Sequence, residues 1–347
     1  MLAYLIKRVL LMIPTFLGIT ILCFALTQFV PGGPVEQRLM EMRGIMGAEG
    51  GAAAVSASGP SNVTEQARKE LIEYYGFDKP LLQRYKKWLL DDDLGLSMRS
   101  YKFTDKTAWQ LISSRIPVSL WFGITGFVLS YIVCIPLGIA KALRHGTKFD
   151  AISSALVFIG YAIPSFALGM VLKMLLCGTV DSLWDIFPIG GISSENHALL
   201  STFGKFTDRL WHMALPVTCY VAGNFAMLTL LMKNSLLDQM SADYIRTVLS
   251  KGATRSHAVW HHALRNSLIP IATGFGGIMT AMFAGSVIIE RVFEIPGMGL
   301  LSLESIETRD YPVFMGILSL TSIFGLFGQL ISDLCYVLID PRIRFTK

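Results

Sequence analysis

The sequence predicts an all-α polytopic membrane protein with six transmembrane helices, both termini on the inner side and a large first outer loop. Three observations lead to this fold class. Apolar residues make up 52% of the 347-residue chain and charged residues only 16%, whereas an average soluble domain is about 25% charged. The apolar residues form six stretches of the length that a bilayer core requires, about 20 residues per helix. Basic residues gather at alternate ends of these stretches.

The expected spans are Val9–Val30, Pro117–Ala140, Ile152–Leu176, Trp211–Met232, Leu268–Ile289 and Val313–Leu338. The first is longer than the apolar core of a signal peptide, and Pro31-Gly-Gly-Pro34 follows it where a cleavage site would stand. We therefore interpret it as a retained anchor. The spans belong to a single domain, residues 1–347.

The orientation follows from the placement of Lys and Arg near the span ends. With the N-terminus inside, the inner segments carry 13 basic and four acidic residues. The outer segments 177–210 and 290–312 reverse this balance, with two basic residues each against four and five acidic ones. Both termini and the loop 233–267 are therefore expected on the inner side.

Few ionisable groups fall inside the spans. Lys173 and Asp333 lie near span ends, and we expect them to reach the interface by snorkelling. A carrier driven by protons or sodium places acids or histidines at mid-membrane, and an enzyme needs a catalytic motif. The sequence offers neither. A stand-alone channel or secondary carrier for small solutes, and a membrane scaffold or enzyme, are kept as alternative interpretations.

The first outer loop, residues 31–116, is the one sizeable segment outside the membrane. Its Gly/Ala/Ser-rich part, Gly47–Pro60, is typical of a flexible stretch. Glu65–Tyr75 predicts a helix, and Pro80 can start a second one that Asp91-Asp-Asp93 ends. This loop is either a docking surface for an external partner or a solvated surface loop.

The inner loop between the fourth and fifth spans is more informative. Asp243–Ser250 predicts a helix, and Gly252 can adopt the left-handed conformation that ends it. Thr254 can then cap a second helix that carries His257 and Val259. The result is two short helices joined at a glycine corner.

This hairpin is suited to being pushed by another protein, because two spans continue from it. We expect Arg255, His257 and Val259 to form a mixed polar and apolar surface that fits a protein groove. An ordinary basic loop that only sets the topology is the alternative. His257 and His261 have the spacing of a metal pair, but no carboxylate or cysteine completes the site, so no metal is expected.

At this loop the sequence resembles the permease subunits of ATP-binding-cassette importers for dipeptides and oligopeptides. The matching pattern is Asp243-Tyr-x-Arg-Thr-x-x-x-Lys-Gly252 followed by His262-x-Leu-Arg-Asn-x-x-x-Pro270. The general "EAA" letters of such loops are missing, since Arg246-Thr-Val248 stands in their place. Other matches are Pro31-Gly-Gly-Pro34, Gly76–Leu82, Asp93–Ser97, Ile163–Phe166, Glu290-x-Val-Phe-x-x-Pro-Gly-x-Gly299, Arg309–Pro312 and Asp340–Arg342. Lys233-Asn-Ser235 and the Arg309 and Asp340 stretches look most like the branch that handles microcin C and related peptides.

The resemblance implies a type I importer permease in the bacterial inner membrane. It would move short peptides or peptide-like compounds, with a second homologous permease as a heterodimer partner, a cytoplasmic ATP-binding-cassette ATPase and a periplasmic solute-binding protein. The chain would not be an enzyme and would hold no cofactor, because ATP and Mg are bound by the ATPase. No nucleic acid partner is expected.

The residues expected to couple the chain to the ATPase are Asp243, Arg246, Gly252, Ala253, Thr254, Arg255, Ser256, His257 and Val259. Small or polar residues on apolar spans, together with two residues of the outer motif, are candidates for the pathway or an outer gate: Ser165, Asn224, Thr273, Ser286, Glu290 and Phe293. Helix packing is the alternative role for the first four, and an ordinary tight turn for the last two.

Overall fold

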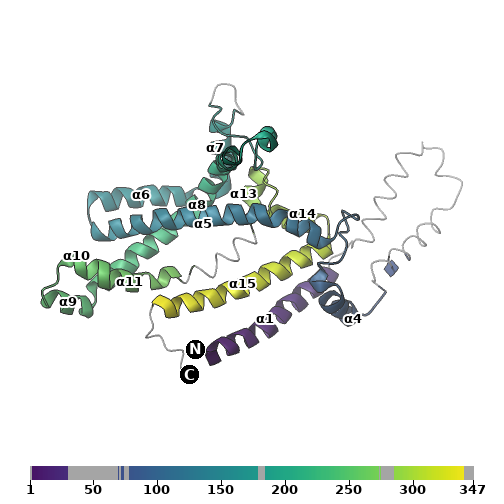
Figure 1. Ribbon diagram of the computed structural model, residues 1–347, viewed down its shortest axis with the longest axis horizontal. Coiled ribbons are helices and arrows are strands. Elements are labelled where there is room, and N and C mark those ends of the chain that lie inside the picture. The colour runs from purple at the N-terminus through teal and green to yellow at the C-terminus, as the bar shows by residue number, and fades with distance from the viewer. Residues whose placement is uncertain are drawn as a thin grey trace. The chain divides into compact units, whose positions relative to one another are not determined.

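The computed structural model describes residues 2–29, 69, 72–73, 78–178, 184–272, 274 and 285–339. Their regular structure is helical (Figure 1). The chain divides into two compact units. Unit 1 comprises Met1–Met12, Arg115–Leu301 and Thr321–Lys347, and unit 2 comprises Ile13–Ser114 and Ser302–Leu320.

Three helices are each long and apolar enough to cross a membrane on their own. They are α1 (Leu2–Phe29), α5 (Ala108–Leu143) and α15 (Tyr311–Ile339). They contain the first, second and sixth expected spans almost completely. The candidate spans within the described residues number three, or five if each of two bent helix pairs counts as one. The expected fifth span lies largely outside these residues, so the count of six stays a prediction.

The third expected span is not one straight helix. It consists of α6 (Lys148–Ala162) and α7 (Ser165–Leu176), which are bent by 93°. The break falls at Pro164, where Ile163 is extended with φ −85° and ψ 119°. Proline lacks an amide hydrogen and forces the residue before it out of the helical region.

The fourth expected span lies in α8 (Thr202–Ser241), which bends by 48° next to Gly223. From the end of α8 the chain continues through α9 (Asp243–Ser250), α10 (Arg255–Ala258), η4 (Val259–Ala263) and α11 (Leu264–Ser267). Figure 1 shows these short helices at the end of unit 1 away from α7 and α13 (Val287–Val292). Two further elements are η3 (Glu195–Leu199) and α14 (Met298–Glu307).

The outer helix expected after Pro80 is confirmed. α4 (Leu81–Lys86) follows this proline directly and continues into η1 (Lys87–Asp91), a π-helical turn. A short turn, η2 (Asp93–Gly95), then reverses the chain through three successive positive φ angles, of 50°, 62° and 82°. The expected helix over residues 65–75 and the 47–60 stretch lie outside the described residues, apart from residues 69, 72 and 73.

The two ionisable residues noted inside the spans both have protein partners. Lys173 donates to the carbonyl of Val292 at 3.0 Å and pairs with Glu294 at 3.3 Å. Asp333 accepts from Arg8 at 3.0 Å and from the Tyr4 hydroxyl at 3.1 Å. Pairing within the protein thus accompanies, or replaces, the snorkelling that the sequence suggested.

In unit 2, Asp310 fastens the turn around Ser100 to the start of α15. Its carboxylate, on a residue that is 3% exposed, accepts from the Ser100 hydroxyl and from the amides of Tyr101 at 3.0 Å and Lys102 at 3.4 Å. A buried carboxylate that receives several donors orders the segment that supplies them. The Arg309–Pro312 motif is therefore a structural clamp.

We expect Asp310→Ala to loosen this turn, because the buried hydroxyl and amides would lose their acceptor at a cost of about 1–3 kcal/mol. Hydrogen exchange of the Tyr101 and Lys102 amides should become faster. Asp105→Ala, which removes an exposed acid from the same segment, serves as the control and should leave both rates unchanged. Equal rates in the Asp310 variant and the wild type would contradict the clamp.

Candidate functional site

The inner hairpin begins with α9, which has the bounds that the sequence predicted. It ends in two bonds: the Gly252 amide donates to the Leu249 carbonyl at 3.0 Å, and the Ala253 amide donates to Val248 at 3.4 Å. These two bonds define a Schellman motif, in which the residue after the C-cap is left-handed. Gly252 occupies that position with φ +88°. A Cβ atom there would meet nothing within 4 Å, so the backbone conformation alone calls for glycine.

The second arm of the hairpin is capped as predicted. The Thr254 hydroxyl accepts from the His257 amide at 3.3 Å at the start of α10. The arm then runs through the π-helical turn η4 into α11. The rings of His257 and His261 stack with centroids 4.2 Å apart.

The tip of the hairpin is exposed, with one exception to our expectation. Asp243, Arg246, Gly252, Thr254, Arg255, Ser256 and His257 are exposed and Ala253 is half-buried. Val259, which we placed on the docking surface, is only 3% exposed and packs into the core. Leu249 and Trp260 are the exposed apolar residues here, at 39% and 51%. The sequence analysis missed them. Val259 follows His257 by two positions, and side chains at that spacing lie on different sides of a helix.

The base of the hairpin is fixed to the span helices. Val259 joins Ile245, Leu236, Met232 and Ile139 in one buried apolar cluster that includes residues of α5 and α8. Polar contacts reinforce this packing.

Two of these polar contacts link the arms of the hairpin to α8. The Tyr244 hydroxyl donates to Gln239 at 2.8 Å and receives a bond from Asn266 at 3.2 Å. The buried Ser235 hydroxyl donates to the carbonyl of Ser267 at 2.9 Å. Both arms of the hairpin are therefore attached to α8 by hydrogen bonds.

A buried charge cluster lies next to this base. Lys233 on α8 contacts both carboxylate oxygens of Asp150 on α6, at 2.7 and 2.8 Å. Lys141 on α5 lies 3.3 Å from the same carboxylate and donates to the hydroxyls of Ser153 and Ser154 at 2.9 and 2.7 Å. Lys141, Asp150 and Lys233 are 0%, 6% and 9% exposed. Three helices are thus joined through one carboxylate.

The sequence analysis used these three residues to orient the chain, and Lys233 also for the family resemblance, but it did not bring them together. Lys233 and Asp150 are 83 positions apart, so no local spacing indicates that they meet. The one available signal was that Lys233 directly follows an apolar span and has no acidic residue within one helical turn of it in the sequence.

The predicted pathway and gate residues are described only in part. Thr273 and the side chain of Asn224 lie outside what the structure describes. Ser165 starts α7 directly after the break at Pro164 and is half-buried. Ser286 and Glu290 are bonded to each other, since the Ser286 amide donates to the Glu290 carboxylate at 3.1 Å.

Glu290 is the centre of a tightly packed turn. It is 1% exposed and also accepts from the Leu300 amide at 2.7 Å. A Cβ atom on Gly285, Gly297 or Gly299 would come within 2.2 to 3.1 Å of this carboxylate. Burial raises the pKa of Glu290, against the lowering effect of the amides that bond to it. The glycines of the Glu290–Gly299 motif therefore leave room for a buried carboxylate.

Phe293 is 2% exposed and packs in the outer apolar cluster with Phe122, Met213 and Cys219. Its carbonyl accepts from the Gly191 amide at 2.9 Å. In this conformation Glu290 and Phe293 belong to a tightly packed turn, which is the alternative to a gate that the sequence analysis left open.

The described part of unit 1 also has an apolar cavity of about 480 Å³ between α5, α6 and α8. It is lined by Leu129, Val133, Leu137, Ser153, Leu156, Val157, Gly160, Thr218, Val221, Ala222 and Phe225. Ser153 is shared with the charge cluster, because its hydroxyl accepts from Lys141. The cavity wall and the charge cluster are thus adjacent on α6.

Comparison with known families identifies the class of this protein. Residues 134–345, which include the hairpin and the charge cluster, match the family model described as binding-protein-dependent transport system inner membrane component. The chain belongs to this family of membrane permease subunits.

Several relatives align over nearly the whole chain. It is 39% identical to the inner membrane ABC transporter permease protein YejB of Escherichia coli O157:H7, with 99% of both chains covered. It is 36% identical to the peptidoglycan transport system permease protein YejB of Agrobacterium fabrum, again with 99% of both covered. It is 34% identical to the oligopeptide transport system permease protein AppB of Bacillus subtilis, over 99% of this chain and 100% of that one.

We expect Asp150→Asn to destabilise the protein by about 3–5 kcal/mol, because two buried ammonium groups lose their counter-charge. Lys233→Met in the same chain should recover part of this loss, since it removes one of the uncompensated charges. The measurement is a double-mutant cycle on the thermal stability of the purified protein.

Lys148→Met is the control partner for this cycle, since Lys148 is an exposed lysine in the first turn of α6. Its effect should simply add to that of Asp150→Asn. Additivity of the Lys233 pair as well would rule out an energetic coupling through the cluster.

Proposed function

We propose that this chain is a permease subunit of an ATP-binding-cassette importer for short peptides or peptide-like compounds, and that its inner hairpin is the element on which the ATPase acts. The observation that carries the proposal is the hairpin itself, whose tip is exposed and whose base is fixed to α5 and α8. Family membership adds the type of transport system. Both termini would then be cytoplasmic, in a bacterial inner membrane.

The proposed docking surface is the exposed rim of the hairpin: Leu249, Arg255, Ser256, His257 and Trp260. It combines a cation, a ring that is half exposed and an aliphatic side chain. Aromatic residues and arginine are enriched where protein interfaces bind most tightly. The surface therefore suits a groove on a protein with a complementary acidic or polar rim.

A movement of the hairpin tip can be passed to the spans because the base of the hairpin is packed against them and hydrogen-bonded to α8. The arms are bonded to α8 through Tyr244 and Ser235, and α8 is bonded to α6 through Lys233 and Asp150. ATP then acts as a ligand that favours one of two conformations of the whole assembly. Residues Asp243 and Arg246 form an exposed ion pair of 3.5 Å on α9, which contributes little by itself.

The substrate class is inferred from the relatives, whose names refer to oligopeptide and peptidoglycan transport. Microcin C-type compounds are a narrower proposal within this class. The remaining partners we propose are a second, homologous permease subunit and a periplasmic solute-binding protein. A stand-alone channel or carrier is the competing function, and it would transport without an ATPase.

Gly252→Val should separate ATP hydrolysis from uptake. A β-branched residue opposes a positive φ at a cost of about 1–3 kcal/mol, so the corner would shift and the second arm would leave its register. With the complex in proteoliposomes, we expect peptide uptake per ATP hydrolysed to fall roughly tenfold, which corresponds to about 1.4 kcal/mol.

Two controls test whether the corner is responsible. Gly252→Asn should keep most of the coupling, because asparagine tolerates the left-handed region. Gly191→Val places the same strain at another glycine with positive φ and an open surrounding, on an outer segment, and should keep the ratio of uptake to hydrolysis. Normal uptake by Gly252→Val would defeat the coupling role of the hairpin.

A pull-down in mild detergent tests the proposed partners directly. The wild-type chain should co-purify with an ATP-binding-cassette ATPase and a second permease chain. Arg255→Glu with Trp260→Ala should lose the ATPase and retain the other permease, because only the hairpin surface is changed. Uptake by the purified chain alone in liposomes would support the carrier instead.

A further inference from the structure

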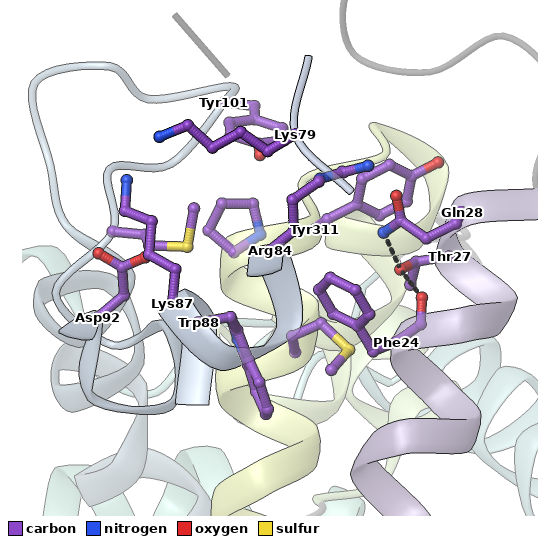
Figure 2. Close-up of a pocket in the computed structure, with 13 residues that line it drawn as sticks. Phe24, Thr27, Gln28, Lys79, Arg84, Lys87, Trp88, Asp92, Tyr101 and Tyr311 are labelled. Carbon is purple, nitrogen blue, oxygen red and sulfur yellow. Dashed lines mark hydrogen bonds between the residues drawn. The ribbon is translucent and has the colours of Figure 1, made fainter. Parts of the chain in front are cut away.

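Unit 2 contains a cavity of about 80 Å³ that the transport mechanism above does not use (Figure 2). Its lining combines three cations, Lys79, Arg84 and Lys87, with a single acid, Asp92. The other lining residues are Phe24, Thr27, Gln28, Trp88, Met98, Tyr101, Tyr311, Pro312 and Met315. Several water-sized groups fit into this space, which is enough for a phosphate group and too little for a peptide.

The position of the cavity relative to the membrane can be read from its walls. The candidate span Tyr4–Gln28 ends at the cavity, and the candidate span Tyr311–Cys335 begins at it. The cavity therefore lies at the depth where hydrocarbon gives way to water, which is the level of the lipid phosphates and of interfacial tyrosine and tryptophan residues.

The helix that supplies two of the cations has the character of an interfacial helix. α4 and η1 carry Arg84 and Lys87, yet Leu81, Leu82 and Leu90 on the same segment are 51%, 79% and 62% exposed. Exposed leucines beside cations are typical of a helix that lies in the headgroup region.

This interfacial segment is held firmly against α1. Tyr85 bonds to Thr20 at 2.9 Å and packs edge-on against Phe24, with ring centroids 5.4 Å apart. Trp88 is 4% exposed and packs on the same ring at 6.2 Å. The cations are therefore presented from a fixed scaffold.

From these observations we infer that the cavity binds the phosphate of an anionic phospholipid, which Lys79, Arg84 and Lys87 contact from the rim. Figure 2 shows the nitrogen ends of the three basic side chains above Phe24 and Trp88. Burial lowers the pKa of Arg84, against the raising effect of Tyr101 and Asp78, so an anion beside the guanidinium would favour its charged form. The acyl chains would lie along α1, whose Leu22 and Leu26 are 63% and 58% exposed.

The test uses the purified, delipidated full-length protein, titrated with dioleoylphosphatidylglycerol, with bound lipid counted by native mass spectrometry. In the variant Lys79→Gln/Arg84→Gln/Lys87→Gln, binding of the first lipid should weaken roughly tenfold or more, because each nearby cation contributes to the attraction of an anionic lipid. The control Lys86→Gln/Lys102→Gln/Lys106→Gln removes the same charge from exposed lysines outside the cavity and should bind as the wild type does.

The double variant Lys79→Gln/Lys87→Gln changes only exposed side chains and should show an intermediate loss even if the triple variant folds poorly. Equal binding by cavity and control variants would overturn the inference. So would displacement of the lipid by millimolar inorganic phosphate, which indicates a site for free anions. The inference would also be overturned if the cavity variants bound lipid normally but no longer captured a solute-binding protein. None of these outcomes depends on transport activity.

Discussion

Two ammonium groups and one carboxylate are held away from water where α5, α6 and α8 meet next to the base of the hairpin. An unpaired charge in such a place costs several kcal/mol, so the three helices cannot separate there without a large loss. The hydroxyls of Ser153 and Ser154 accept hydrogen bonds from the ammonium group of Lys141. These bonds make the burial of the charge tolerable. The base of the inner hairpin follows from this constraint, because α8 carries both Lys233 and the start of the hairpin.

Two other buried carboxylates, Glu290 in unit 1 and Asp310 in unit 2, are used in a different way. Glu290 and Asp310 are as deeply buried as Asp150, but they accept from backbone amides and a hydroxyl, whereas Asp150 pairs with two lysines in addition to accepting from the Gly146 amide. An amide is a fixed part of the chain, whereas a lysine side chain can swing to a new partner. The turns around Glu290 and Asp310 are therefore held by fixed backbone groups, and the charge cluster is built from ion pairs between side chains of three different helices.

The sequence predicted what depends on neighbours along the chain. The bounds of α9, the Gly252 corner and the Thr254 cap are set by residues a few positions apart, and the apolar stretches predicted α1, α5 and α15. Features that arise between distant residues were missed. The partner of Lys233 is 83 positions away, and the partners of Glu290 are amides, which have no sequence signature. Val259 was placed on the exposed surface beside His257, although side chains two positions apart lie on different sides of a helix. The break at Pro164 was missed because the residues on both sides of it are apolar.

The charge cluster also determines where a movement of the hairpin would be felt first. Lys233 contacts Asp150 in the first turn of α6, and Ser153 in the next turn both accepts from Lys141 and lines the apolar cavity. A shift of α8 is thus passed to the cavity wall through contacts of 2.7 to 2.9 Å, and Val157 and Gly160 follow along the same helix. The break at Pro164 separates this wall from α7, because α6 ends there and α7 continues at an angle of 93°. The cavity wall that carries Ser153 is therefore linked to the hairpin through α8, which is the connection that the proposed coupling requires.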